Sequence, residues 1–232
     1  MRRVFIGHDA NEPVALWVLA HSIMRRASVP AEIIPLVLRQ LPLDRPRDPM
    51  QSTEFAFSRF LVPWLCGFDG EAAFLDCDML CRADIGELFH GARKDRAVSV
   101  VQHDYTPHAE PKFLGHVQTR YPRKNWSSVM VFQNSRCSRL TPAYVNTAPG
   151  LDLHQFKWLS DEEIGMLDPA WNHLVGEYPP NPAAKLVHFT RGTPCFAKFA
   201  RCEWADEWYA ERARMLDLIP AGQYSLRDRE AA

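Results

Sequence analysis

The chain has 232 residues, 47% of them hydrophobic and 24% charged, a composition typical of globular proteins that excludes a disordered chain. With 27 Lys and Arg against 28 Asp and Glu, the formal net charge is −1, which excludes the strongly basic surface that non-specific nucleic-acid binding needs. The length favours a single domain over residues 1–220, followed by a polar tail over 221–232.

The first predicted elements alternate between strand and helix. Val4–Gly7 is a short apolar run that indicates a buried strand, and a helix capped by Asn11 is expected to follow and to end at Arg26. A second strand is predicted over Ala31–Leu38, and the proline-rich stretch Leu41–Met50 indicates a loop. Next comes a predicted helix that begins at Ser52 or Thr53 and has apolar residues at helical spacing, namely Phe57, Phe60, Leu61 and Trp64.

Three further buried strands are predicted at Ala72–Leu75, Ala97–Val101 and Val129–Phe132. Beyond residue 138 the pattern is mostly helical, with one last strand at Lys185–Phe189. This alternation predicts an α/β fold with a Rossmann-like sheet flanked by helices, in which ligands bind at the carboxyl ends of the strands.

Asp76 and Asp78 follow one of these predicted strands directly. Residues i and i+2 of an extended segment point to the same side, so both carboxylates can face one divalent cation, Mg²⁺ or Mn²⁺. An Asp-x-Asp arises roughly once by chance in such a chain, so a pair of solvated turn aspartates is the alternative. The position after an apolar strand favours the cation.

The segments Ala73–Leu80 and Ala83–Phe89 resemble the DxD region of glycosyltransferase family 8. More pieces of the chain resemble that family in the same order: Val4–Ser22, Phe57–Phe60, Asn125–Phe132 and Leu186–Thr190. The resemblance implies a GT-A fold and a metal-dependent transfer of a sugar from a nucleotide-sugar donor, expected to be a UDP-sugar. The acceptor would be a hydroxyl of a glycan, lipid or protein, and the configuration would be retained.

The resemblance also implies roles for individual residues. Mn²⁺ or Mg²⁺ would be held by Asp76, Asp78 and His188. The donor would be bound by a larger set: Asp9 and Asn11 at the nucleoside, Arg59 at the diphosphate, and Asn125 and Ser127 beside the sugar. Apart from the resemblance, Lys124 is a further cation that can neutralise charge on the diphosphate together with Arg59.

Two parts of the family pattern are altered. Asp161 and Glu162 stand in place of the family's Asp-Gln pair and are the candidates for the catalytic residue beneath the sugar, together with Arg59 near the reacting phosphate. The family's lysine after the histidine is missing, and Arg191 or Lys198 can supply the cation instead.

Other interpretations stay open on the residues alone. Paired aspartates on a similar sheet also serve nucleotidyltransferases, and the altered segment after His188 is compatible with a nucleotide-sugar or glycan-binding module without activity. His103, His108 and His116 form a conceivable zinc site, although their spacing matches no common finger. Trp126, Trp158 and Trp171 can stack on sugars or belong to the core.

The sequence also indicates the cellular compartment. The N-terminal residues show no signal-peptide pattern, the apolar runs are too short to span a membrane, and the six cysteines contain no CxxC pair. We expect a reduced, cytoplasmic protein without a transmembrane segment, which meets soluble acceptors or docks peripherally on the inner membrane face.

Overall fold

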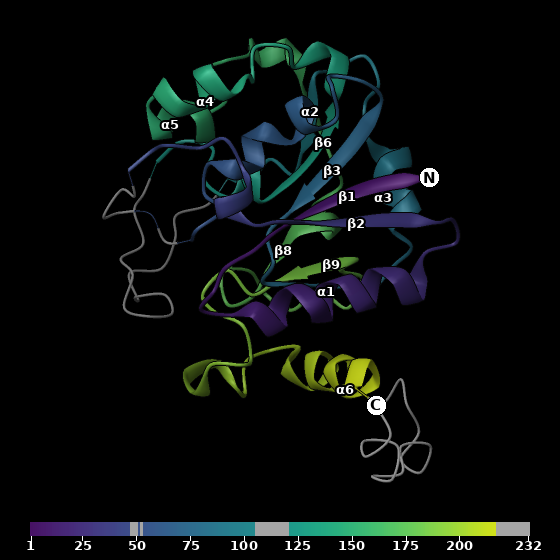
Figure 1. Cartoon of the computed structure of the whole chain (residues 1–232). Coiled ribbons are helices and arrows are strands. Elements are labelled where there is room, and N and C mark those ends of the chain that lie inside the picture. Colours follow the sequence, from purple (N-terminus) through teal and green to yellow (C-terminus); the bar gives the residue numbers. More distant parts are fainter. Residues whose placement is uncertain (47–50, 52, 105–120, 217–232) are drawn as a thin grey trace, which may run out of the picture.

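The fold is built on a six-stranded mixed sheet. A computed structural model describes residues 1–46, 51, 53–104 and 121–216, and its main sheet has the strand order β2-β1-β3-β6-β5-β7 (Figure 1). These strands are β1 (Arg2–Gly7), β2 (Ala31–Leu36), β3 (Glu71–Leu75), β5 (Val98–Val100), β6 (Val129–Gln133) and β7 (Ile164–Met166). Strand β6 is antiparallel to both of its neighbours, whereas the other pairings are parallel. The carboxyl ends of the five parallel strands therefore meet at one edge of the sheet.

A second, smaller sheet brings a late part of the chain to this edge. Its order is β4-β9-β8, formed by β4 (Met79–Cys81), β9 (Leu186–His188) and β8 (His173–Leu174). Strands β4 and β9 are antiparallel, and their register pairs Met79 with His188. Because Met79 directly follows Asp78, this pairing carries His188 to the DxD segment.

Helices cover the sheets on both sides. They are α1 (Pro13–Arg26), α2 (Val62–Leu65), α3 (Ile85–Gly91), α4 (Pro142–Thr147), α5 (Gly150–His154) and α6 (Ala205–Leu216). Helix α1 lies between the sheets and α6, and α4 and α5 lie at the opposite end of the molecule from α6 (Figure 1). Leu16, Leu19 and Ile23 of α1 recur at helical spacing and are buried in the main core. Asp84 caps α3, since its carboxylate accepts a hydrogen bond from the backbone N–H of Gly86 at 2.9 Å.

The absence of a side chain at Gly7 is required at the end of β1. A Cβ at this position would lie 2.4 Å from the ring of Phe55, a separation that real atoms do not tolerate. Phe55 is 1% exposed and packs beside Phe74 of β3, with 6.2 Å between the ring centroids. Gly7 thus lets the segment that follows residue 53 pack against the carboxyl edge of the sheet.

The predicted fold class is confirmed, but several predicted elements are wrong in detail. Asn11 is not the cap of α1: Glu12 occupies the N-cap position and makes no side-chain capping bond. The helix expected after Thr53 is instead a 3₁₀ turn over Ser58–Leu61 followed by the single turn of α2, which has Pro63 near its start. Trp64 consequently stays 37% exposed.

Differences in the strands are smaller. The second strand ends at Leu36 and not at Leu38. The region beyond residue 138 contains the short strands β7 and β8, which a helical pattern did not predict because strands of two or three residues carry too little periodicity. The polar tail expected over 221–232 and the cap residue Ser52 lie outside the described residues, and the domain boundary at residue 220 stays a prediction.

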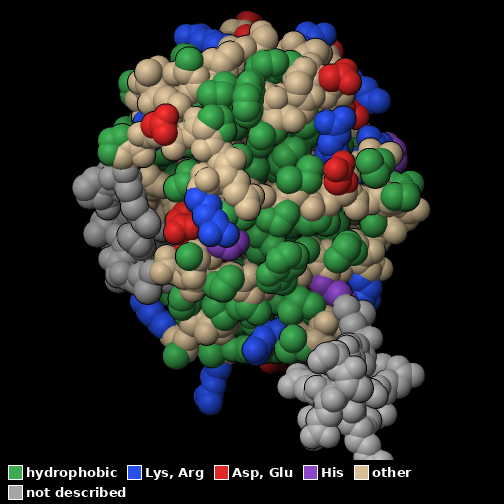
Figure 2. All heavy atoms as spheres, viewed as in Figure 1, with side chains coloured by type: hydrophobic (Ala, Val, Ile, Leu, Met, Phe, Trp, Pro, Cys, Tyr) green, Lys and Arg blue, Asp and Glu red, His purple; other side chains and the backbone are tan. Residues whose placement is uncertain are grey.

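The surface matches the balanced charge of the sequence. Figure 2 shows acidic and basic side chains interspersed around hydrophobic ones on the face viewed in Figure 1. Among the described residues, every helix is too short or too polar to cross a lipid bilayer.

Helix α6 is held on α1 by the carboxylate of Glu211, which is 1% exposed. Arg25 reaches it at 3.0 Å, Arg26 at 3.1 Å and His21 at 2.7 Å. Burial alone would raise the pKa of Glu211, but the hydrogen bonds from Arg25 and His21 and the charge of Arg26 outweigh it and lower the pKa to about 2. The ion pairs therefore stabilise the folded state while Glu211 is ionised.

We expect Glu211→Gln to lower the free energy of unfolding by about 1–3 kcal/mol at neutral pH, because hydrogen bonds to a charged group are replaced by neutral ones. The folded pKa is depressed, so this contribution is present above the ordinary pKa near 4.5 and is lost as the pH falls toward 2. Urea unfolding between pH 7 and 3 should show a shallower acid dependence for the variant. Asp95→Asn, which breaks an exposed pair with Arg93, serves as control and should change stability by less than about 0.5 kcal/mol. Equal acid dependence in wild type and Glu211→Gln would contradict this role.

Candidate metal centre

Asp76, Asp78 and His188 come together at the carboxyl edge of the main sheet. One ligand atom from each lies within 4.8 Å of the others. His188 Nε2 is 3.3 Å from Asp78 Oδ1 and 4.0 Å from Asp76 Oδ2. The backbone N–H of Phe189 donates to the carbonyl of Asp78 at 2.8 Å, so the β4–β9 pairing itself sets the separation of these groups. The three residues predicted as metal ligands are thus assembled in one place.

Arg59 supplies positive charge beside this group. Its Nη1 lies 2.8 Å from Asp76 Oδ1 and donates to the carbonyl of Ser127 at 2.8 Å. The guanidinium stacks near the rings of Phe55 and Phe74, at 5.2 and 4.9 Å. Arg59 is 5% exposed, so its guanidinium is held by protein contacts and is shielded from solvent. A guanidinium held in this way is suited to bind phosphate oxygens.

Two further buried carboxyl groups, those of Asp9 and Glu12, lie near the same centre. Burial raises the pKa of Glu12 well above its ordinary value, and the charge of Asp78 raises it further, while a hydrogen bond from Thr193 acts in the opposite direction. Thr193 Oγ1 donates to Glu12 Oε2 at 2.8 Å. Burial is the largest cause of this shift and the neighbouring carboxylates add to it, so Glu12 lies in a buried, acidic environment that a hard divalent cation would stabilise. The donor set of two carboxylates and one imidazole fits a divalent cation.

Asp9, which the sequence predicts at the nucleoside, is buried and hydrogen-bonded within the protein. It is 1% exposed, and its Oδ1 accepts from the backbone N–H of Asn11 at 2.9 Å and from the Asn11 side chain at 2.8 Å. Its Oδ2 accepts from the backbone N–H of Glu54 at 3.1 Å. Asp9 therefore ties the turn after β1 to the segment that carries Arg59, and Asn11 is the more exposed member of the pair.

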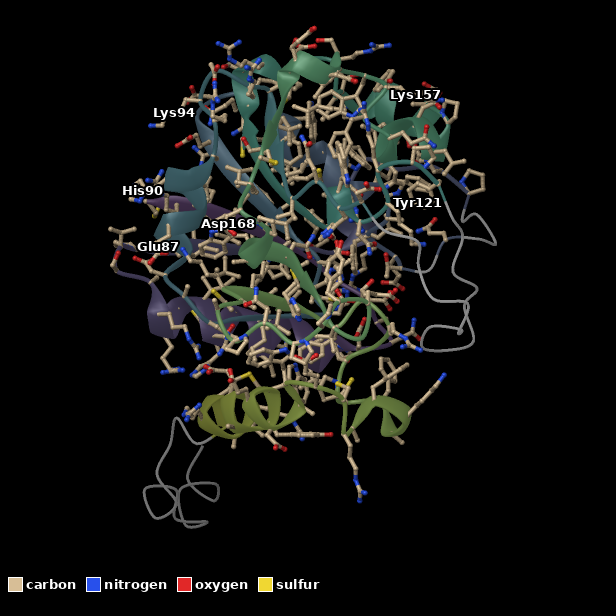
Figure 3. The ribbon with its side chains drawn as sticks, turned by 180° about the vertical axis from the view of Figure 1, so that it is seen from behind. Glu87, His90, Lys94, Tyr121, Lys157 and Asp168 are labelled. Atoms are coloured by element: carbon tan, nitrogen blue, oxygen red, sulfur yellow. The ribbon has the colours of Figure 1, made fainter. Side chains whose placement is uncertain are left out.

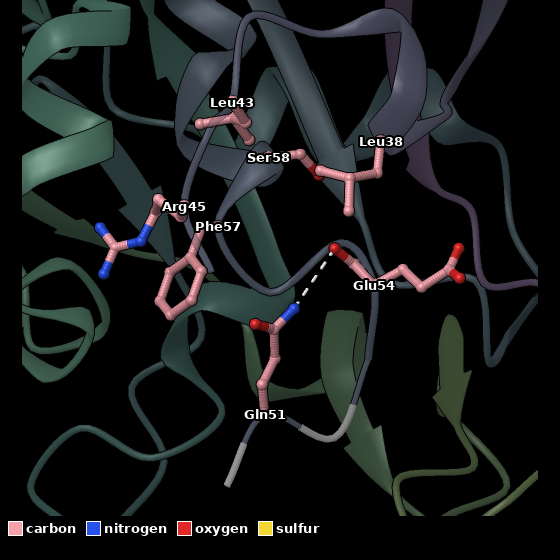
Figure 4. A pocket seen from close by; sticks show the side chains of 7 residues that line it. All are labelled: Leu38, Leu43, Arg45, Gln51, Glu54, Phe57 and Ser58. Atoms are coloured by element: carbon pink, nitrogen blue, oxygen red, sulfur yellow. Dashed lines mark hydrogen bonds between the residues drawn. The ribbon is translucent and has the colours of Figure 1, made fainter. Parts of the chain in front are cut away.

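A pocket lies on the outer side of this tie. It is bounded by residues from the stretch after β2 and from the segment before Arg59: Leu38, Leu43, Arg45, Gln51, Glu54, Phe57 and Ser58 (Figure 4). Gln51 Nε2 donates to the carbonyl of Glu54 at 3.4 Å. The backbone N–H of Glu54 donates to Asp9, so the pocket adjoins the end of β1. The sequence predicts that the nucleoside binds at this end.

Lys124 lies on the Arg59 side of the centre. Its Nζ is 5.3 Å from the ring of Tyr121. Burial raises the pKa of Tyr121, with smaller effects of opposite sign from Arg59 and Asp76, so all of these groups are near one another. Figure 3 shows Tyr121 on the side of the molecule opposite to Glu87 and His90 of α3.

Asn125 and Ser127 shape the chain next to this side. Asn125 adopts a left-handed conformation with φ 63°, which asparagine tolerates better than most residues. Ser127 Oγ is hydrogen-bonded to His154 Nδ1 at 2.8 Å. Burial lowers the pKa of His154 to about 3, with help from the charge of Arg59, so a neutral ring lies under Ser127 at neutral pH.

Asp161 and Glu162 are not brought to the metal centre. They directly precede β7, whose first residue Ile164 pairs with Val98 at the start of β5. Strands β5 and β7 run parallel to β3, so the amino end of β7 lies toward the opposite end of the sheet from Asp76. The side chain of Asp161 is 84% exposed and is bonded to Arg123, and Glu162 is exposed as well. The structure therefore places both carboxylates away from the metal centre, and a role beneath the sugar stays a prediction.

The remaining candidates are an arginine, two tryptophans and the three histidines. Arg191 lies against the loop after β8, where a Cβ added to Gly176 would meet its side chain at 3.4 Å. Trp158 and Trp171 are 4% and 2% exposed and belong to the main core. Of the conceivable zinc ligands, His103 is buried beside Tyr178, at 3.0 Å from its hydroxyl, whereas His108 and His116 lie outside the described residues.

Comparisons with known proteins agree with this fold. No model of a protein family matches the chain. "Protein CDI" of Arabidopsis thaliana is 46% identical over 220 residues, which cover 90% of this chain and 85% of that protein. The chain belongs to the same family as this plant protein.

Solved glycosyltransferase structures share the architecture at low sequence identity. The apo bifunctional glycosyltransferase WbbM has a TM-score of 0.61 and 15% identity, over 90% of this chain and 51% of its own. The galactosyltransferase LgtC, solved with donor and acceptor sugar analogues, has a TM-score of 0.57 and 11% identity over 98% and 99% of the two chains. Mouse xyloside xylosyltransferase 1 has a TM-score of 0.53 and 11% identity over 82% and 97%. The chain thus spans about half of WbbM, and the resemblance to family 8 and the GT-A fold is confirmed at the level of structure.

We expect Glu12→Gln to stabilise the metal-free protein at pH 8 by at least about 1 kcal/mol, or about 2–4 °C in Tm. A carboxyl group whose folded pKa is raised costs stability as the pH rises above its ordinary value near 4.5, and the amide removes that cost. The gain should therefore vanish near pH 4. Thermal unfolding in EDTA measures it, with the exposed Glu162→Gln as control. A variant that is less stable than wild type at pH 8 would contradict the cost of ionising this buried carboxyl group.

Proposed function

We propose that this protein is a metal-dependent glycosyltransferase that transfers a sugar from a nucleotide-sugar donor, a UDP-sugar, to a hydroxyl acceptor. The observation that carries the proposal is the convergence of Asp76, Asp78 and His188 beside a buried arginine at the carboxyl edge of a GT-A sheet. Ligands of open α/β sheets bind at this edge. The galactosyltransferase and xylosyltransferase names of two structural neighbours are consistent with a sugar donor.

Asp76, Asp78 and His188 would hold the divalent cation, Mn²⁺ or Mg²⁺. When bound, such an ion withdraws charge from the leaving diphosphate. Arg59 and Lys124 would bind the phosphate oxygens from the opposite side, since Arg59 contacts Asp76 and Lys124 lies beside Tyr121. Fixed positive charges that need no reorganisation stabilise a developing diphosphate more strongly than solvent does.

The nucleoside would lie beyond β1. Asn11 would contact it directly, and Asp9 would act by holding the turn and the Glu54 segment in place. Asn125, Ser127 and Arg191 would surround the sugar, the first two from the turn before β6 and the third from the segment after His188. Retention of configuration is part of the proposal only through the family resemblance.

A second candidate is a nucleotide-sugar-binding protein that does not transfer the sugar. It is favoured by one observation: Asp161 and Glu162, the carboxylates expected beneath the sugar, lie at the amino end of β7. Such a protein would bind the donor through the same residues. The two candidates therefore differ in turnover and not in binding.

Calorimetric titration with UDP in Mn²⁺ should show binding that disappears in EDTA. Asp78→Asn should weaken it by at least about 100-fold, because the cation loses one charged ligand and with it the contact to the diphosphate. The exposed Asp95→Asn serves as the matched control and should bind as wild type does. Metal-independent UDP binding, or equal binding by Asp78→Asn, would exclude this assignment.

Product analysis separates the enzymatic candidates. A glycosyltransferase that is incubated with UDP-galactose or UDP-glucose, Mn²⁺ and a panel of hydroxyl acceptors releases UDP. It also releases UDP slowly when water replaces the acceptor. Arg59→Ala should reduce the rate of UDP release by about 10–1,000-fold. A nucleotidyltransferase given a nucleoside triphosphate and a sugar phosphate would release pyrophosphate instead. Donor binding without either product would favour the binding protein.

A further inference from the structure

The third metal ligand is oriented by a side chain that lies outside the resemblance. Asn172 ends the short 3₁₀ turn Pro169–Asn172, just before β8, and is 0% exposed. Its Oδ1 lies 2.9 Å from His188 Nδ1. Asn172 lies in a segment that is separate in sequence from the DxD segment and from β9. Its contact with His188 therefore forms only when the chain has folded.

The orientation of the Asn172 amide follows from a fixed backbone acceptor. The carbonyl oxygen of Asn125 accepts hydrogen bonds from Ser128 Oγ at 2.6 Å and from Asn172 Nδ2 at 3.3 Å. Because the Ser128 hydroxyl proton is used in this way, Ser128 Oγ accepts from Asn172 Nδ2, at 2.8 Å. Both contacts require the amide nitrogen of Asn172 on this side, which leaves its oxygen toward His188.

An amide oxygen can only accept, so His188 Nδ1 carries the proton at this contact. In the neutral ring the lone pair is then on Nε2, the atom that faces Asp78 Oδ1 at 3.3 Å and Asp76 Oδ2 at 4.0 Å. The Nε2 lone pair and the two carboxylates thus converge on one point, which a bound cation would occupy. The same arrangement is what a metal-bound imidazole needs.

We infer that Asn172, held by the carbonyl of Asn125 and by Ser128, is a positioning residue that fixes His188 in the Nδ1–H form and aims Nε2 at the cation. This inference rests on the proposed metal centre, although the ring form itself can be measured without metal. It adds a residue to the site from a stretch outside the segments on which the resemblance rests. Asn125 thereby acts through its backbone carbonyl, whatever its side chain contacts.

The first test is ¹⁵N NMR of histidine-labelled, metal-free protein, in which the shifts of the two ring nitrogens show which of them is protonated. As the pH is raised until the ring of His188 holds one proton, wild type should keep it on Nδ1. Asn172→Leu, which removes the acceptor at similar volume, should shift the ring toward a mixture or the Nε2–H form. A neutral His188 ring with its single proton on Nε2 in wild type would overturn the inference.

The second test is Mn²⁺ affinity by electron paramagnetic resonance of the free ion. Asn172→Leu should weaken binding by about 10–100-fold. Asn172→Asp, which keeps an acceptor for Nδ1–H, should recover most of that loss. Ser128→Ala removes a hydrogen bond of the same network but leaves the amide bound to the Asn125 carbonyl, so it should weaken binding by less than about 3-fold.

The outcomes separate the two claims. If wild type does not bind Mn²⁺, the proposed function fails, and the NMR measurement still decides the role of Asn172. If wild type binds Mn²⁺ and Asn172→Leu binds it equally, the positioning role is overturned and the metal centre stands. Circular dichroism of each variant confirms that a loss of affinity is not a loss of fold, and equal losses in Asn172→Leu and Ser128→Ala would also overturn the specific role of Asn172.

Discussion

The constraint on which this structure depends is buried negative charge at the carboxyl edge of the main sheet. Asp9, Glu12, Asp76 and Asp78 are each 9% exposed or less, and isolated carboxylates are costly to bury. Three of the four have a compensating contact within the protein. Asp9 accepts backbone and side-chain N–H groups, Glu12 keeps its proton more tightly and accepts from Thr193, and Asp76 meets Arg59.

The fold explains why these groups meet there. The parallel strands β1 and β3 end side by side, so the turns after them present Asp9 and Asp76 at the same level of the sheet. The small sheet then adds His188, because β9 pairs with the strand that directly follows Asp78. A local motif and a distant strand thus form one centre through ordinary backbone hydrogen bonding, and no unusual backbone geometry is needed at the ligands themselves.

The sequence predicts the parts of this arrangement that are local. Apolar runs identify β1, β3 and β6, and the spacing of Asp76 and Asp78 indicates a shared face. Glu12 and Asn172 have no such signal, since a glutamate at the start of a helix and an asparagine before a short strand are common on surfaces. Their roles depend on contacts between segments far apart in the chain, here with Thr193 and His188.

Asp161 shows where a motif match and the fold differ. A match of residue types to a motif says what a segment resembles, but the end of the strand at which a residue lies decides which side of the sheet it reaches. Glu162 and Asp161 precede β7, whereas every residue of the metal centre follows a parallel strand or belongs to the small sheet. A residue of this segment that reached the carboxyl edge of the sheet would be expected to follow β7 and not to precede it. Among the described residues, fixed charges gather at the carboxyl edge around Asp76, so the proposed stabilisation of a leaving group is placed there and not at the amino end of β7.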